Sequence, residues 1–326
     1  MRQPRIKIDP DEFDAVYHCI SRVVAGDRLL DARSREVLRK MLWEVAEFCG
    51  IEILTYILLS NHFHIYLLVP KRTPLSDEEL LRRYAILHPR PTRYETRRLE
   101  RIREQLATNG PLAVDFRRRM RRLMNNVSCF MQLLKQRFTL WYNDDHERFG
   151  TLWSGRFKSL LNEIDPEVNT AVGAYIDLNS VRAGLRTDPK DYRFSGYAEA
   201  LAGNARARKG IMFLTGCDNW ESASARYRQA VFAIGSAEKE KGAKLSVSQL
   251  LEVIRQGGRL PLATLLHCRI RYLTEGLILG SPEFVQRHLG LCQKDLVRPR
   301  RTHVLPCHVE GKALAIPKRL RGPVLA

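Results

Sequence analysis

Hydrophobic residues in the first part of the chain gather in short runs that are typical of β-strands. Residues 17–24, 51–59 and 62–69 are rich in β-branched and aromatic side chains, and polar or turn-forming residues flank each run. Only Ser60 and Asn61 lie between the second and third runs. Because so short a connection cannot cross over a sheet, these two strands are expected to pair antiparallel.

Helical spacing of apolar residues follows in the segments between and after these strands. It covers residues 34–48 and 127–142, and an Asp-Pro pair should begin a further helix over residues 165–182. A fourth strand is expected at 160–164. This order of strands and helices predicts an α+β fold.

The C-terminal part has a different pattern. We expect two units, residues 1–204 and a mostly helical extension over 205–326, with a loop of small residues around 202–210 between them. From about residue 295 the chain is basic and rich in proline, which is typical of a loosely ordered tail. Two segments of the extension are expected to be helical, residues 246–255 and 262–278.

The composition narrows the class of protein. The chain has 326 residues, of which 44% are hydrophobic, so it can bury a core. Lysine and arginine number 54 against 36 aspartate and glutamate residues, a net charge of +18. So basic a protein favours nucleic acid as its partner. No apolar run is long enough to cross a membrane, and no signal peptide is expected. The seven cysteines are scattered and odd in number, which favours a reduced, cytoplasmic protein without disulfides.

Residues 71–124 form an arginine-rich insertion with helix-like patterns. Its densest group is Arg117, Arg118 and Arg119. One interpretation is a solvated helical surface, and the other is an arm whose guanidinium groups contact phosphate. The net charge of the chain favours the second interpretation.

His62 and His64 are the first candidates for chemistry. Side chains alternate along a strand, so both imidazoles should lie on one face and Phe63 on the other. Two such imidazoles can bind one divalent metal ion, or they can be hydrogen-bonded strand histidines. The apolar flanks indicate a central strand, where two polar side chains need a partner. This favours a pair of metal ligands.

The helix expected near residue 175 carries a second group. Tyr175, Asn179 and Arg182 recur at helical spacing and share a face. A tyrosine hydroxyl can act as a nucleophile when a metal ion and cations stabilise the developing charge. The amide oxygen of Asn179 could be a further metal ligand. The alternatives are a core tyrosine and an asparagine that caps the helix.

Four stretches together resemble the single-tyrosine HUH transposases, the family that includes insertion-sequence-200-like and REP-associated tyrosine transposases. They are YHCISR at 17–22, LSNHFHIYLLVP at 59–70, FGTLWSGRFKS at 149–159 and YIDLNSVRAGL at 175–185. The stretches occur in the order expected for the family. Two positions depart from its usual pattern, Ser180 in place of proline and Leu59-Ser60 in place of Met-Pro.

The resemblance implies a ferredoxin-like antiparallel sheet with helices. It also implies cleavage and rejoining of single-stranded DNA through a 5′-phosphotyrosine intermediate with Mg²⁺ or Mn²⁺. On this resemblance Tyr175 is the nucleophile, His62 and His64 are metal ligands, and Asn179 is a third, amide-type ligand. A homodimer is compatible with it, because relatives can supply the tyrosine helix from a second protomer.

Several cations are candidate DNA contacts. Arg156 and Lys158 share a face if their segment is extended, and Arg22 shares a sheet face with His18. Trp153 could stack on a base or belong to the core, and Tyr142 and Phe157 raise the same alternatives. The full set of expected DNA contacts is Arg22, Arg117, Arg118, Arg119, Arg156, Lys158 and Arg182.

Two other functions compete with the enzyme. One is a domesticated protein that binds DNA hairpins without cutting them, and the other is a basic RNA-binding protein. The presence of His62, His64 and Tyr175 in one chain favours the enzyme, because a pure binding protein has no need of that trio.

Overall fold

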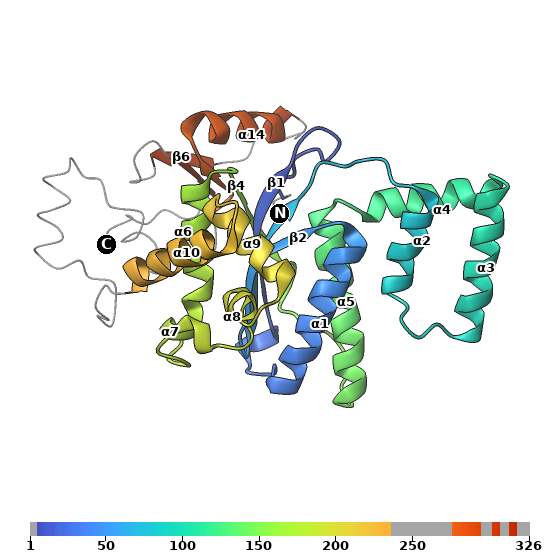
Figure 1. The fold of residues 1–326 in the computed structure, drawn as a ribbon, viewed down its shortest axis with the longest axis horizontal. Helices are drawn as coiled ribbons and strands as arrows, with labels where there is room; N and C mark the ends of the chain where they lie inside the picture. The colour runs from blue at the N-terminus through green and yellow to red at the C-terminus, as the bar shows by residue number, and fades with distance from the viewer. Residues whose placement is uncertain (1–4, 236–275, 295–301, 307–312, 318–326) are drawn as a thin grey trace, which may run out of the picture.

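The computed structural model describes residues 5–235, 276–294, 302–306 and 313–317. The fold is α+β, with one mixed sheet in the order β2-β3-β1-β4-β5-β7-β6 and helices on both of its faces (Figure 1). The first four strands are β1 (Ala15–Arg22), β2 (Glu52–Leu58), β3 (His62–Val69) and β4 (Lys158–Asn162).

These four strands form the ferredoxin-like core expected from the sequence. The pairs β1–β3, β1–β4 and β2–β3 are all antiparallel. Helix α1 (Ala32–Cys49) connects β1 to β2, and α5 (Val127–Asp145) lies between β3 and β4. Asp31 caps α1 by accepting a hydrogen bond from the Ser34 backbone, and Gly50 ends the helix in the left-handed region at φ +64°.

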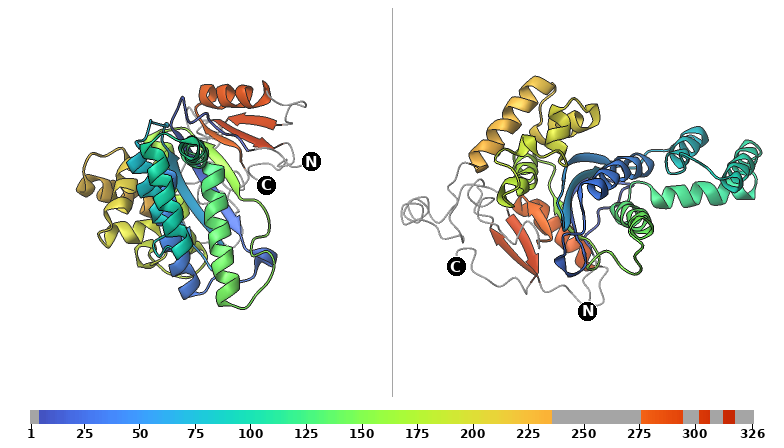
Figure 2. Two further views of the ribbon diagram at one scale, coloured as in Figure 1. Left: turned by 90° about the vertical axis from the view of Figure 1, so that its right-hand side faces the viewer. Right: turned by 90° about the horizontal axis from the view of Figure 1, so that it is seen from below.

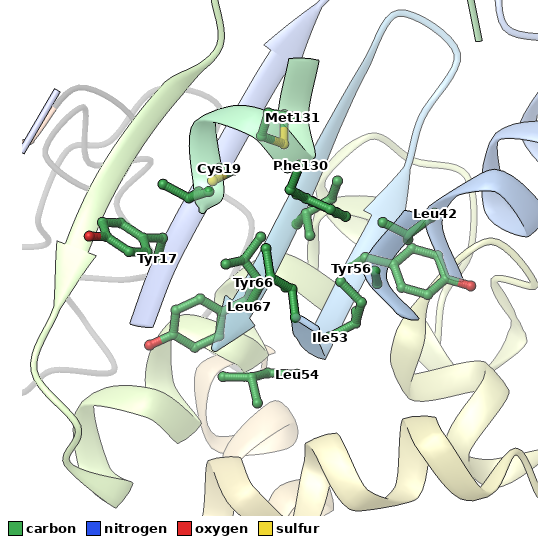
Figure 3. Close-up of a cluster of buried hydrophobic side chains, with 14 of the residues drawn as sticks. Tyr17, Cys19, Leu42, Ile53, Leu54, Tyr56, Tyr66, Leu67, Phe130 and Met131 are labelled. Carbon is green, nitrogen blue, oxygen red and sulfur yellow. The ribbon is translucent and has the colours of Figure 1, made fainter. Parts of the chain in front are cut away.

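Helices α1 and α5 pack together and cover one face of the sheet. Figure 3 shows part of the buried cluster, in which Leu42 of α1 and Phe130 of α5 belong to the same core as Cys19 and Leu67 of the strands. Phe63, on the face opposite the two histidines, is also buried and contacts Trp153 at 5.4 Å between ring centroids.

A second group of helices covers the face that carries His62 and His64. It comprises α6 (Pro166–Asp177), α7 (Asn179–Arg182), α8 (Gly196–Leu201), α9 (Ala205–Thr215) and α10 (Trp220–Gly235), with a short 3-10 turn at Pro189–Asp191. A second 3-10 turn, Val24–Gly26, follows β1. The helix expected over 165–182 divides at Leu178 into α6 and α7. Asp165 caps α6 and Pro166 opens it, as predicted.

The expected loop at 202–210 was wrong at its end, because Gly210 lies inside α9. A Cβ atom at this glycine would lie 2.7 Å from the Ile53 carbonyl oxygen and closer still to that of Leu54. The small residue thus allows α9 to pack directly on the backbone of β2.

The insertion at 71–124 is helical, as expected. It forms α2 (Asp77–Ile86), α3 (Arg93–Ala107) and α4 (Pro111–Leu123). We call these three helices the arm. The arm projects from the α1 and α5 side of the molecule, away from α6 and α7 (Figures 1 and 2).

The C-terminal part is mostly helical where the structure describes it, but it also adds three strands that were not predicted. Strand β5 (Ile278–Gly280) runs parallel to β4, and β7 (Ala313–Pro317) and β6 (Thr302–Pro306) continue the sheet antiparallel. Helix α14 (Pro282–Lys294) follows β5. Two expectations are therefore corrected: Ile278 lies in a strand, and the tail beyond 295 contains a strand pair.

The expected helix at 246–255 lies outside the described residues, as does most of the one at 262–278. The division into 1–204 and 205–326 remains a prediction, although β5 joins the sheet of the first unit. In the part of the chain that the structure describes, no helix is both long and apolar enough to cross a lipid bilayer.

Candidate active site

His62 and His64 lie on one face of the central strand β3, with ring centroids 5.2 Å apart. In the β1–β3 register Arg22 is directly opposite His62 and Ile20 is opposite His64. Lys158 of β4 is opposite Ile20. Directly opposite residues share a face of the sheet, so the side chains of Arg22 and Lys158 lie on the histidine face.

Asn61 determines which nitrogen of His62 carries the proton. Its side-chain amide donates to the Gly26 carbonyl oxygen at 3.2 Å, so its oxygen must be the atom 2.6 Å from Nδ1 of His62. An amide oxygen only accepts hydrogen bonds, so Nδ1 is the donor. In the neutral ring the lone pair is therefore on Nε2.

His64 is held by a third histidine, which the sequence suggested only as a neighbour of Arg22 on the sheet. His18 Nε2 lies 2.8 Å from Nδ1 of His64, and the two rings stack with centroids 5.1 Å apart. Both residues are buried. A histidine at this place on β1 gave no signal in the sequence beyond the alternation that puts its side chain on the same face.

Both candidate metal ligands are neutral near pH 7. Burial, with the charge of Arg22 as a smaller cause, lowers the pKa of His62 to about 4. Burial first and the neighbouring His18 second hold the pKa of His64 well below its usual value. Neutral imidazoles are the form that binds metal ions.

Tyr175 of α6 lies against His64 and His18. Its ring centroid is 6.4 Å from that of His64 and also 6.4 Å from that of His18, with edge-to-face geometry in both cases. The guanidinium carbon of Arg182 lies 4.5 Å from the centroid of the tyrosine ring. Arg182 also donates to the Tyr175 carbonyl oxygen at 3.1 Å. Tyr175 is 5% exposed.

Asn179 caps the end of α6. Its side-chain nitrogen donates to the carbonyl oxygens of Tyr175 and Ile176, each at 3.0 Å. This arrangement is the helix-capping role that the sequence left open as an alternative. The amide is planar, so its oxygen points away from these carbonyls, and a role as metal ligand remains a prediction.

Two buried hydrogen-bonded groups fix α6 on the sheet, one on each side of Tyr175 along the helix. Near the start of the helix, Tyr66 donates to the side-chain oxygen of Asn169 at 2.6 Å. At its end, Asp177 accepts hydrogen bonds from Thr55 at 3.0 Å and from Tyr227 at 2.6 Å. Neither group was predicted, although Asn and Asp inside an apolar helix are a signal of such contacts.

The carboxyl group of Asp177 has an unusual acidity. Burial raises its pKa to about 7, and the hydrogen bonds from Tyr227 and Thr55 only partly oppose that effect. At neutral pH the group is therefore close to half protonated inside the core.

The predicted DNA contacts fall into two separate places. Arg22, Lys158 and Arg182 lie at or next to the histidine face, and the exposed Arg156 precedes β4. The other three, Arg117, Arg118 and Arg119, lie on α4 in the arm, away from α6 and α7. Their role and that of the site cations remain predictions.

The three aromatic residues proposed to stack on bases are buried instead. Tyr142, Trp153 and Phe157 are all 7% exposed or less, so core packing is the correct alternative. Trp153 donates a hydrogen bond to the Thr139 hydroxyl at 2.8 Å. The exposed aromatic of this segment is Phe149.

Two histidine nitrogens alone would leave a metal ion with open coordination positions. Among the described residues no group of three or more His, Cys, Asp or Glu side chains could hold a metal ion. His62 and His64 could supply two neutral nitrogens, and the remaining positions would belong to an amide, water or phosphate oxygens. A closed structural zinc site would need four protein ligands.

No family model matches this chain, and no curated protein has a matching sequence. A similar solved structure is a REP-associated tyrosine transposase bound to a REP hairpin, with a TM-score of 0.40 and 14% sequence identity. The alignment covers 62% of this chain and 87% of the transposase chain. The chemistry of the site is therefore argued from its own geometry.

Proposed function

We propose that this protein cleaves and rejoins single-stranded DNA, with Tyr175 as the nucleophile and a divalent metal ion held by His62 and His64. The observation that carries the proposal is the approach of Tyr175 to His64, 6.4 Å between ring centroids, beside a second neutral histidine. His62 presents the lone pair of its Nε2 atom, because its Nδ1 atom donates to the side-chain oxygen of Asn61.

The reaction is a transesterification at phosphorus. The oxygen of Tyr175 forms a bond to the phosphorus atom and the bond from phosphorus to the 3′ oxygen breaks. That oxygen takes a proton from water and leaves as a 3′ hydroxyl. The tyrosine gives up its proton to water, and the 5′ end remains attached to the protein as a phosphotyrosine. A bound Mg²⁺ or Mn²⁺ would supply positive charge that polarises a non-bridging phosphate oxygen.

The cations around the site have roles that follow from their positions. Arg22 and Lys158 can bind phosphates of the strand on the histidine face. Arg182 rests on the ring of Tyr175, and an incoming phosphate would attract its guanidinium group away from the ring. This movement would uncover the hydroxyl when substrate binds.

One observation favours a second function, a protein that binds DNA hairpins without cutting them. Tyr175 is 5% exposed and is covered by Arg182, which limits the access of a phosphate to its hydroxyl. Such a protein would use the same cations for phosphate but would form no covalent bond.

The test is incubation of the full chain with end-labelled single-stranded DNA containing a hairpin, in Mn²⁺, followed by denaturing electrophoresis. We expect a covalent protein–DNA species and, after digestion, a peptide in which Tyr175 carries a 5′-linked nucleotide. Binding without any covalent species, over a panel of hairpins and both metal ions, would favour the second function.

A further inference from the structure

Positive charge is distributed unevenly among the three helices of the arm. Residues 71–124 contain fifteen lysine and arginine residues against seven aspartate and glutamate residues, a net charge of +8. Most arginines of α2 and α4 form ion pairs. The pairs are Arg82 and Arg83 with Glu79, Arg117 with Asp77, Arg118 with Asp115 and Arg121 with Asp11.

Helix α3 differs, because none of its arginines takes part in an ion pair with the residues that the structure describes. All five are exposed: Arg93, Arg97, Arg98, Arg101 and Arg103. Its first acidic residue, Glu95, forms a capping box with Thr92 and lies 2.9 Å from Nδ1 of His88. Of the seven arginines of the arm that form no ion pair with the described residues, five therefore lie on α3, together with Glu100 and Glu104.

An exposed aromatic residue lies within this charge. Tyr94 is 74% exposed, and Arg97, Arg98 and Arg101 follow it at intervals of three, four and seven residues. Residues at this spacing form one continuous patch on a helix. The buried side of α3, with Ile102 and Leu106, faces the rest of the arm. We call Tyr94, Arg97, Arg98 and Arg101 the α3 patch.

The chemistry of the α3 patch fits single-stranded nucleic acid. Guanidinium groups bind phosphates, and a planar phenol can stack on any unpaired base. Helices that bind lipid surfaces present several large apolar residues along the polar boundary, whereas Tyr94 is the one aromatic of this patch.

We propose that the α3 patch is a second binding surface for single-stranded DNA, separate from the site at the histidines. The arm extends away from α6 and α7, so one strand on α3 and one at Tyr175 would occupy different sides of the molecule (Figures 1 and 2). The choice of DNA over RNA rests on the proposed function. The surface would hold a flanking part of the same substrate or a second strand.

The test compares two triple variants of the full chain by fluorescence anisotropy with a labelled single strand over a range of salt concentrations. Arg97→Gln/Arg98→Gln/Arg101→Gln removes the patch, and Arg33→Gln/Arg82→Gln/Arg121→Gln removes the same charge from exposed, ion-paired arginines outside α3. We expect the patch variant to flatten the slope of log affinity against log salt by about two units. The control should change it by less than half as much.

Separate variants test whether the ring of Tyr94 stacks on a base. Tyr94→Leu should weaken single-strand binding about tenfold, whereas Tyr94→Phe keeps a ring and should bind as the unchanged protein does. A strand with 5-iododeoxyuridine should crosslink to a peptide containing residue 94. Equal losses in the two triple variants, or crosslinks confined to other peptides, would overturn the inference.

These measurements need no metal ion and no cleavage, so the two proposals fail separately. A chain that binds through α3 but forms no covalent species retains this inference and loses the proposed function. A chain that cleaves DNA while the patch variant binds normally retains the proposed function and loses this inference.

Discussion

The Nε2 atom of His18 lies 2.8 Å from the Nδ1 atom of His64, in the buried layer between the sheet and α6. If His64 donates this hydrogen bond, its Nε2 atom keeps the lone pair, as that of His62 does opposite Asn61. Both candidate ligands would then present the same nitrogen to a metal ion. A hydrogen bond at the far nitrogen is what usually fixes the orientation of a metal-bound histidine.

We predict that His18→Phe lowers the affinity for Mn²⁺ by about ten- to a hundredfold. Phenylalanine can keep the ring stack on His64 but cannot accept its hydrogen bond, so the imidazole is free to rotate or change tautomer. The affinity is measured by calorimetric titration of the protein without DNA.

The control for this prediction is His18→Gln, whose side-chain oxygen can accept from Nδ1 of His64. It should recover part of the affinity, while circular dichroism of both variants stays that of the unchanged protein. Equal Mn²⁺ binding by all three proteins would show that the His18–His64 contact does not orient a ligand.

We predict that Tyr175→Phe abolishes the covalent protein–DNA species and changes DNA affinity by less than about twofold. The substitution deletes only the hydroxyl, and the phosphate contacts of the surrounding cations persist. Denaturing gels report the covalent species and anisotropy reports the affinity. Survival of the covalent species would move the nucleophile to another tyrosine.

The core of the fold was predictable because its signals are local. Alternation along residues 62–69 placed both histidines on one face, and the two-residue connection at Ser60 and Asn61 required antiparallel pairing. Asp165 and Pro166 marked the start of α6 through capping that depends on only a few neighbouring residues.

The remaining features depend on partners far away in the sequence. Strand β5 has three residues, which are too few for a periodic pattern. It is a strand because it pairs with β4, which lies more than a hundred residues earlier in the sequence. The ion pair of Arg117 with Asp77 likewise joins two helices of the arm. A run of arginines does not reveal which members are neutralised, so the sequence favoured Arg117 as a DNA contact. Most arginines of the arm without ion pairs lie on α3 instead.

The contact of α9 with β2 gives a prediction for stability. Gly210→Ala should lower the free energy of unfolding by about 1–3 kcal/mol, because its Cβ would meet the carbonyl oxygens of Ile53 and Leu54. The matched control is Gly290→Ala in α14, where a Cβ meets nothing within 4 Å. It should raise stability by up to about 1 kcal/mol, since alanine favours a helix over glycine. Chemical denaturation measures both, and equal effects at the two sites would rule out the close contact.

Asp177 should make the stability of the protein depend on pH between about 4 and 7. Its pKa is raised from 3.8 to about 7 in the folded state, so in this range the folded chain binds more protons than the unfolded chain. The contribution of this group to stability is therefore greatest at low pH and falls as pH rises to 7, by up to about 4 kcal/mol. Asp177→Asn keeps an oxygen that can accept from Tyr227 but has no charge, so the variant should lack this decline.

Asp188→Asn is the control for this prediction. Hydrogen bonds from Arg228 lower the pKa of Asp188 to about 2, so its removal should leave the slope between pH 4 and 7 unchanged. Denaturant unfolding of the three proteins at several pH values measures the difference. A decline of equal size in Asp177→Asn and the unchanged protein would mean that another group causes it.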